Sequence, residues 1–262
     1  HKLPLGQENV PHLLYRLNHE FLPFERPIAF NPLLASEKAA STHLLQLFTD
    51  FLRILQAEGP VKLTAKGNLP VKLVKRLFYE LNYDYAQADW RREDVHREAD
   101  AWFVATLHDL AKVMRLVKVR KNALSLTKSG ELFLCGSSTE NYYVLFWNYI
   151  VTYNLGYEPD HEPFPQFLYR YVFMLLAEFG RQEREIGFYS NKILDIYPLL
   201  LDRDKNEEEE RYWFGYTLYS VIMQCLLAEF GLVQTRFERE RGVRGKYFVQ
   251  RTPLFDEVFV RW

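Results

Sequence analysis

The sequence is poor in cysteine and carries almost no net charge. Its 262 residues include two cysteines, Cys135 and Cys225, which excludes a disulfide framework, and no C-x-x-C pair of a zinc or redox site is present. The 33 basic and 34 acidic residues give a net charge of -1, so no overall positive field favours nucleic acid. Any such preference must be local, and we expect a reducing, cytoplasmic location.

Catalytic and membrane-spanning patterns are absent as well. No run of about 18 apolar residues predicts a membrane span. The phosphate-binding patterns G-x-x-x-x-G-K-[ST] and G-x-G-x-x-G do not occur, and neither does the nucleophile pattern G-x-S-x-G. The seven histidines include no i, i+4 pair of the kind that binds zinc on a helix. We therefore expect a non-enzymatic protein with no cofactor, no metal site and no membrane partner.

The first 40 residues contain five prolines, a density that interrupts helices and predicts an extended N-terminal arm over residues 1–40. The chain opens at His1 rather than at a methionine, as expected of a fragment of a longer protein. We expect little chemistry in this segment.

A first unit over residues 41–134 is predicted from its apolar periodicity. Helices are expected where apolar residues recur at spacings of three and four, and strands where short apolar runs border turns. The expected order is a helix from an N-cap at Ser41 to Gly59, a strand (61–64), two helices (69–81 and 102–114), a hairpin (116–120 and 124–126) and a helix capped by Thr127.

A second unit with the same order is predicted over residues 163–262. Its expected elements are a helix (164–179), a strand (186–189), a helix from Ser190 to Leu201, a long helix (208–230), a hairpin (232–237 and 247–250) and a helix starting at Thr252. The pattern W-F-x-x-T-L begins at Trp102 and again at Trp213, 111 residues later, which favours an internal duplication. The four glutamates at 207–210 complement the positive end of the long helix dipole.

Residues 135–162 join the two units. This segment is rich in aromatic residues and contains no Gly/Ser-rich linker. At this density and spacing, a buried aromatic connector helix is expected rather than a surface that stacks on bases or a cofactor.

The order helix, strand, helix, helix, hairpin resembles the winged-helix form of the helix-turn-helix, and RLVKVRKNALSLTKSGELFL (115–134) is similar to the wing region of prokaryotic regulators. Together with LTAKGNLPVKLVKRL (63–77), this segment also resembles the C-terminal region of an uncharacterised bacterial family first noted as plasmid open reading frames. The resemblance covers residues 41–134 well and 163–261 less well. It implies a mainly α (α+β) fold with tandem winged-helix-like units, and transcription regulation through DNA binding.

Basic residues gather in both predicted hairpins and on the helix after the first strand. Residues 61–130 hold 14 Lys/Arg and 8 Asp/Glu, a local net charge of +6. Such cations neutralise phosphates when a wing or a helix face contacts the nucleic-acid backbone. The candidate nucleic-acid contacts are Lys72, Lys75, Arg76, Lys118, Arg120 and Lys121 in the first unit and Arg239, Arg241, Arg244 and Lys246 in the second, where Arg236 and Arg251 complete the basic set.

The third helix argues against base recognition. Its polar positions include Glu98, Asp100 and Asp109, and carboxylates that face phosphates are repelled. Two hypotheses stay open. The chain is either a nucleic-acid-binding regulatory protein that contacts phosphates, or a protein-interaction module or scaffold whose winged helices dock another protein or a second copy of the chain. A continuous positive band would favour the first hypothesis, and patches broken by the three carboxylates the second.

Overall fold

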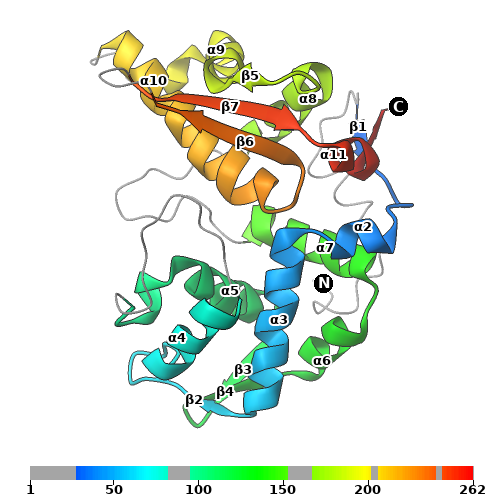
Figure 1. Ribbon diagram of the computed structural model, residues 1–262, viewed down its shortest axis with the longest axis vertical. Coiled ribbons are helices and arrows are strands. Elements are labelled where there is room, and N and C mark those ends of the chain that lie inside the picture. Colours follow the sequence, from blue (N-terminus) through cyan, green and yellow to red (C-terminus); the bar gives the residue numbers. More distant parts are fainter. Residues whose placement is uncertain (1–27, 82–94, 153–166, 202–205, 240–243, 262) are drawn as a thin grey trace. The chain divides into compact units, whose positions relative to one another are not determined.

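The computed structural model describes residues 28–81, 95–152, 167–201, 206–239 and 244–261 (Figure 1). These residues form two compact units. The first comprises the described residues of Ala39–Asn148, and the second combines residues 28–38 with the described residues from 149 onward. Helices make up most of both units, and each unit contains a small three-stranded antiparallel sheet, so the expected mainly α (α+β) fold class is confirmed.

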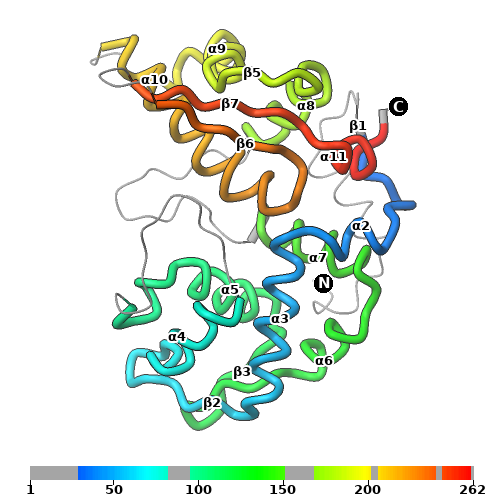
Figure 2. Tube along the Cα trace, in the orientation of Figure 1, coloured from blue at the N-terminus to red at the C-terminus, as the bar shows by residue number. Residues whose placement is uncertain are grey.

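The first unit packs helices against one face of its sheet. In chain order it contains α3 (His43–Glu58), β2 (Val61–Lys62), α4 (Val71–Glu80), η3 (Glu98–Asp100), α5 (Trp102–Val113), β3 (Val117–Arg120), β4 (Ala123–Leu126), α6 (Lys128–Cys135) and α7 (Ser138–Trp147). The strands are ordered β2-β4-β3, with β4 in the middle. The tube in Figure 2 follows the chain through these elements.

Helix α3 forms because apolar residues recur along one broad stripe. The stripe is buried and consists of Leu44, Leu45, Leu47, Phe48, Phe51, Leu52 and Leu55. The helix begins one residue later than predicted, because Thr42 and not Ser41 is the N-cap. The Thr42 hydroxyl donates to the Ala39 carbonyl at 2.8 Å instead of capping a helical N–H. The helix ends at Gly59, whose φ of 71° suits glycine.

The predicted first hairpin is confirmed and closes with a two-residue turn. Lys121 and Asn122 both have positive φ, 51° and 59°, as a type I′ turn requires. The Asn122 amide donates to the Leu63 carbonyl at 2.9 Å and ties the turn to the segment after β2. Thr127 caps α6 as predicted, since its hydroxyl oxygen accepts from the Gly130 N–H at 3.1 Å.

The described part of the predicted connector holds α7 and the π-helix η4 (Asn148–Thr152). Tyr142, Tyr143 and Phe146 of α7 are fully buried, as expected for this aromatic segment. The rings of Tyr142 and Tyr143 meet edge to face with centroids 5.5 Å apart. Helix α7 belongs to the first unit, and residues 153–162 lie outside the described residues.

The second unit contains a sheet of the same strand order, β5-β7-β6. Its elements after residue 149 are α8 (Phe167–Phe179), β5 (Arg184–Glu185), α9 (Ile186–Ile196), η5 (Pro198–Leu200), α10 (Glu207–Thr217), the π-helix η6 (Leu218–Ala228), β6 (Val233–Glu238), β7 (Lys246–Arg251), α11 (Pro253–Val258) and β8 (Phe259–Arg261). Thr252 caps α11 as predicted, and its hydroxyl oxygen accepts from the Phe255 N–H at 3.4 Å.

One predicted strand in the second unit is wrong. Residues 186–189 are the first turn of α9, and the strand is the preceding pair Arg184–Glu185. The buried residues Ile186, Tyr189, Ser190, Ile193 and Leu194 recur at spacings of three and four, which is the period of a helix. Ser190 therefore lies inside α9 and not at its N-cap, and its hydroxyl donates to the Gly187 carbonyl at 3.3 Å.

The predicted long helix over residues 208–230 is present, but its first part is an α-helix and its second part a π-helix. It begins as α10, capped by Asn206, whose side-chain oxygen accepts from the Glu209 N–H at 3.1 Å. It continues as the π-helix η6, whose i→i+5 hydrogen bonds widen the turn. The glutamates at 207–210 occupy the first turn of α10, as expected.

Most of the predicted N-terminal arm, residues 1–27, lies outside the described residues. Its last part contains β1 (Ile28–Phe30) and α2 (Ser36–Ala40). β1 pairs with β8 in an antiparallel two-stranded sheet, and the rings of Phe30 and Phe259 have centroids 4.7 Å apart. Residues 28–30 are thus held by the C-terminal end of the second unit.

Candidate nucleic-acid interface

The outward face of the first sheet gathers three cations from two strands at opposite edges. In the register of β2, β4 and β3, Lys62 and Arg120 both pair with Ala123, and Lys118 pairs with Ser125. Residues paired across strands point to the same face, and so do residues two apart in one strand. Lys62, Lys118 and Arg120 therefore share one face, with only a methyl group and a hydroxyl between them.

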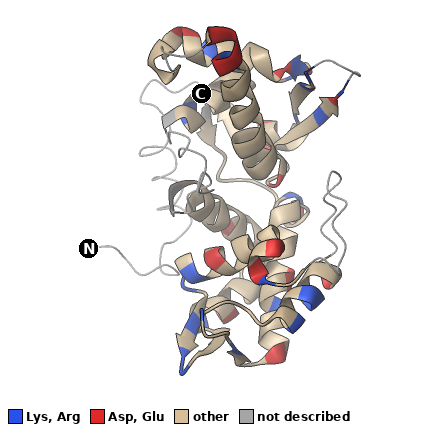
Figure 3. Cartoon of the chain, turned by 90° about the vertical axis from the view of Figure 1, so that its left-hand side faces the viewer, with Lys and Arg blue, Asp and Glu red and all other residues tan. Residues whose placement is uncertain are grey.

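This basic face is open to solvent, whereas the opposite face packs on the helices. Val61, Val117 and Leu124 of the opposite face are buried, and Val119 near the turn is exposed. Lys62, Lys118, Arg120 and the turn residue Lys121 are exposed, and none of the four is ion-paired within the described ranges. The hairpin lies at the lower end of this unit in Figure 3, where its basic positions are blue.

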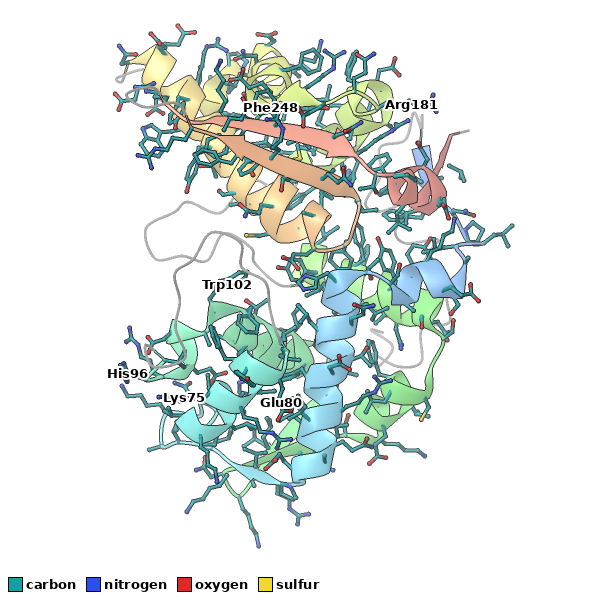
Figure 4. The ribbon with its side chains drawn as sticks, viewed as in Figure 1. Lys75, Glu80, His96, Trp102, Arg181 and Phe248 are labelled. Carbon is teal, nitrogen blue, oxygen red and sulfur yellow. The ribbon has the colours of Figure 1, made fainter. Side chains whose placement is uncertain are left out.

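Helix α4 carries a second set of cations, which differ in whether they form ion pairs. Lys72 is exposed, and Lys75, which is labelled in Figure 4, is half-buried. Their spacing of three residues places them on the same side of the helix. Arg76 forms ion pairs with Glu80, at 2.7 Å between Nε and Oε1, and with Glu58. These pairs raise the pKa of Arg76, the hydrogen bond to Glu80 most of all. Arg76 is therefore occupied by two carboxylates, while Lys72 and Lys75 are better placed for a phosphate.

Tyr79 lies on the same face of α4 as Lys72 and Lys75, and the sequence analysis missed it. It follows Lys72 by seven residues and Lys75 by four, so the three side chains share one face of α4. Its side chain is 70% exposed, which is unusual for an aromatic residue of a helix in a folded protein. The seven-residue spacing is the sequence pattern that could have identified it.

The sequence analysis predicted that the Glu98 carboxylate would repel phosphates. The structure contradicts this prediction, because Glu98 is buried. It lies in η3, ahead of α5, and its side chain is 7% exposed. One carboxylate oxygen accepts from the Leu69 N–H, and the other is 2.6 Å from His108 Nδ1. The charge of Glu98 is thus directed into the unit and not toward solvent.

Asp100 and Asp109 also have partners within the unit. Asp100 accepts from the backbone N–H groups of His96 and Arg97, both at 2.9 Å, and pairs with the Arg97 guanidinium at 2.8 Å. The hydrogen bond from the Arg97 side chain is the main cause that lowers the pKa of Asp100. Asp109 pairs with Lys112 at 2.6 Å. The three carboxylates therefore oppose phosphates less than their sequence positions predict.

Helix α5 cannot serve as a base-contacting helix, since it is buried on most sides. Its buried residues are Phe103, Val104, Thr106, Leu107, His108, Leu110 and Ala111. Lys112 is exposed but is held by Asp109. Insertion into a major groove needs a solvent-facing side with several polar side chains, and α5 has none of that extent.

The outward face of the second sheet is charge-balanced. Arg236 aligns with Phe248 and Glu185 across the strands, and Glu238 aligns with Lys246. The Arg236 guanidinium forms ion pairs with Glu183, at 2.9 Å from Nε, and with Glu238, and these raise its pKa. On this face Arg236 is therefore occupied by two carboxylates, and Lys246 lies across from Glu238.

The other basic residues of the second hairpin have different surroundings. Arg239, Arg244 and Lys246 are exposed, and the Arg244 guanidinium lies 4.7 Å from the Tyr212 ring centroid. Arg241 lies outside the described residues. Arg251 is buried, donates to the Ala177 carbonyl at 2.5 Å and pairs with Asp256 at 2.8 Å. Arg251 therefore stabilises the fold and is not a surface contact.

Within the described residues, no group of three or more His, Cys, Asp and Glu side chains is arranged to hold a metal ion. No helix in the same ranges has both the length and the apolar character needed to cross a membrane.

The fold and this face define a mainly helical α+β protein with a basic sheet surface on its first unit. Residues 40–140 match the family model described as the Y4jL N-terminal domain, which spans the elements from α3 into α7. The match places the similarity in an N-terminal domain, whereas the sequence analysis expected a C-terminal region. Neither the search of curated proteins nor the search of solved structures found a match.

Proposed function

We propose that the first unit is a winged-helix-like domain that binds nucleic acid through its phosphates, in a bacterial regulatory protein without enzymatic activity. The observation that carries the proposal is the outward sheet face, where Lys62, Lys118 and Arg120 lie together without a carboxylate between them. Lys121 at the turn extends this face, and Lys72 and Lys75 supply cations from α4.

The spacing of these cations suits a polymer of phosphates. Lys62 and Arg120 are two strand spacings apart, about 10 Å, so they bind different phosphates and not one anion. Contacts of this kind position a protein on a duplex but carry no base information. With α5 buried, the proposed binding is therefore largely independent of sequence.

The topology supports the winged-helix part of the proposal. The strand between α3 and α4 pairs with the second strand of the hairpin, which gives the order β2-β4-β3. In this arrangement the hairpin is the wing, a part that contacts the backbone in DNA-binding relatives of the fold class. A cytoplasmic location is proposed with it, because two cysteines are too few for the disulfide framework of a small secreted domain.

The test is a titration with mixed-sequence duplex DNA at several salt concentrations. Each neutralised phosphate contributes about -0.9 to the slope of log K against log salt. Replacing Lys118, Arg120 and Lys121 together by Gln should flatten the slope by up to about three contacts' worth. The control replaces Lys38, Arg53 and Arg181, three exposed cations away from this face, and should leave the slope unchanged.

Protein docking is the second candidate function, and the burial of α5 favours it. A winged helix whose third helix is unavailable to DNA can still present its sheet to another protein or to a second copy of the chain. If the chain shows no duplex binding at low salt, or if the triple change leaves the slope untouched, docking becomes the better explanation. Light scattering at two protein concentrations then decides whether the partner is the chain itself.

A further inference from the structure

A continuous chain of aromatic rings lies at the loop end of the second hairpin. Figure 1 shows this end of β6 and β7 beside α10. Trp213 contacts Tyr216 with centroids 5.8 Å apart, and Tyr216 contacts Tyr247 at 5.6 Å. Tyr247 in turn stacks on Phe237 at 5.0 Å with an interplanar angle of 28°. Tyr212 extends the chain beyond Trp213 at 5.6 Å.

Two rings of this aromatic chain are exposed, whereas Tyr247 between them packs against the unit. Trp213 is 51% exposed and Phe237 is 39% exposed. Tyr247 lies against the buried Tyr219 at 4.5 Å, and burial together with the neighbouring phenols raises the pKa of Tyr247 to about 12. The phenol therefore stays neutral at physiological pH. Large apolar side chains are seldom left exposed in contact with one another unless they bind something.

Two arginines flank the loop of this hairpin. Arg239 and Arg244 are exposed, and Arg244 lies over the Tyr212 ring, whereas Lys246 points to the opposite face of the sheet from Tyr247. The nearby Glu238 is held by Arg236, so it offsets these cations less than a free carboxylate would. On the α10 side, Glu207 is paired with Arg211 at 2.9 Å, and Glu208 and Glu209 are exposed.

We propose that this aromatic chain is a second binding site, which stacks unpaired bases of a single-stranded nucleic acid while the hairpin cations contact its phosphates. Exposed aromatic faces flanked by cations bind single strands in this way, with little preference for sequence. The ligand is a nucleic acid, as in the proposed function of the first unit, but the binding surface is a separate one on the second unit. A cationic peptide is the competing occupant, and the Arg244 guanidinium already placed over the Tyr212 ring disfavours it.

The first test uses an oligothymidylate of about eight nucleotides, a length within the usual site size, and an abasic oligomer of equal length and charge. The full chain should bind the thymidylate at least about fivefold more tightly than the abasic oligomer, because each stacked base contributes to affinity. Trp213→Ala should abolish this difference, and Trp213→Phe should keep most of it. Leu199→Ala removes an exposed apolar side chain elsewhere in the unit and should change nothing.

A second variant separates the two occupants by the sign of its effect. Glu209 is exposed and lies one turn before Trp213 on α10. Glu209→Gln should tighten thymidylate binding, because the carboxylate repels phosphates. Weaker thymidylate binding by this variant, or tighter binding of an oligolysine than of the thymidylate by the unchanged chain, overturns the inference in favour of a cationic peptide.

Equal affinity for the two oligomers, no binding of either, or a base-dependent difference that survives Trp213→Ala also overturns the inference. The Lys118, Arg120 and Lys121 triple change distinguishes this failure from failure of the proposed function. It should reduce duplex binding while leaving the preference for thymidylate over the abasic oligomer intact.

Discussion

At the residue scale, the Glu98 carboxylate serves two buried polar groups at once. It accepts from the Leu69 N–H just ahead of α4 and lies against His108 Nδ1 on α5. His108 Nε2 is itself buried and has no hydrogen-bond partner among the described residues, so Glu98 is the imidazole's polar contact there. A buried polar group that loses its partner destabilises the folded state by about 1–3 kcal/mol.

We therefore expect Glu98→Ala to lower the free energy of unfolding by about 2–5 kcal/mol, since it leaves two groups unpartnered. Urea unfolding followed by circular dichroism measures this change. Glu98→Gln keeps an acceptor for Leu69 and the side-chain volume, so its loss should be clearly smaller. Equal losses for the two variants would show that the hydrogen bonds are not the cause.

At the scale of elements, Gly130 allows α6 to approach the start of the hairpin. A Cβ at this position would lie 2.3 Å from the Leu116 carbonyl oxygen, which belongs to the backbone and cannot move aside cheaply. The Thr127 cap closes at the same place, with the Gly130 N–H as its donor. The junction of hairpin and helix thus depends on a residue without a side chain.

Gly130→Ala should lower the free energy of unfolding by about 1–3 kcal/mol, the usual cost of overpacking. Gly187→Ala is the matched control. Gly187 lies within α9, and a Cβ there would meet nothing within 4 Å. That change should raise stability by up to about 1 kcal/mol, because alanine favours helix. Thermal unfolding of both variants gives the comparison, and destabilisation of both by the same amount contradicts the packing argument.

At the scale of the whole molecule, two sheets of the same strand order carry different outward faces. The first face presents unpaired cations, and on the second Arg236 is tied to Glu183 and Glu238. We expect the two hairpins to contribute unequally to duplex binding, because only cations that are free to release counterions add to the salt dependence.

Arg236→Gln should therefore flatten the duplex salt slope by less than about one contact's worth, whereas Lys118→Gln in the first hairpin should flatten it by about one. The measurement is the same salt titration with the same duplex. A larger effect from the second hairpin than from the first would place the main phosphate contact in the second unit.

The sequence by itself determined the fold class, both hairpins and two helix caps. Periodicity, turn residues and caps act over a few positions, so Thr127 and Thr252 could be assigned from their neighbours alone. It also located the cations of the first hairpin. The prediction of a strand at 186–189 was wrong because a short apolar run fits both the strand period and the helix period. The buried residues with helical spacing continue to Leu194, beyond the end of that run.

Tertiary structure decided which charges reach solvent. Glu98, Asp100 and Asp109 look alike in the sequence, yet one is buried against His108 and two are paired locally. Strand register placed Lys62 beside Arg120, 58 positions away in the chain, and gave Arg236 its partner Glu183. Electrostatic interactions depend on distance and burial, which pairing between remote segments sets and which local sequence does not encode.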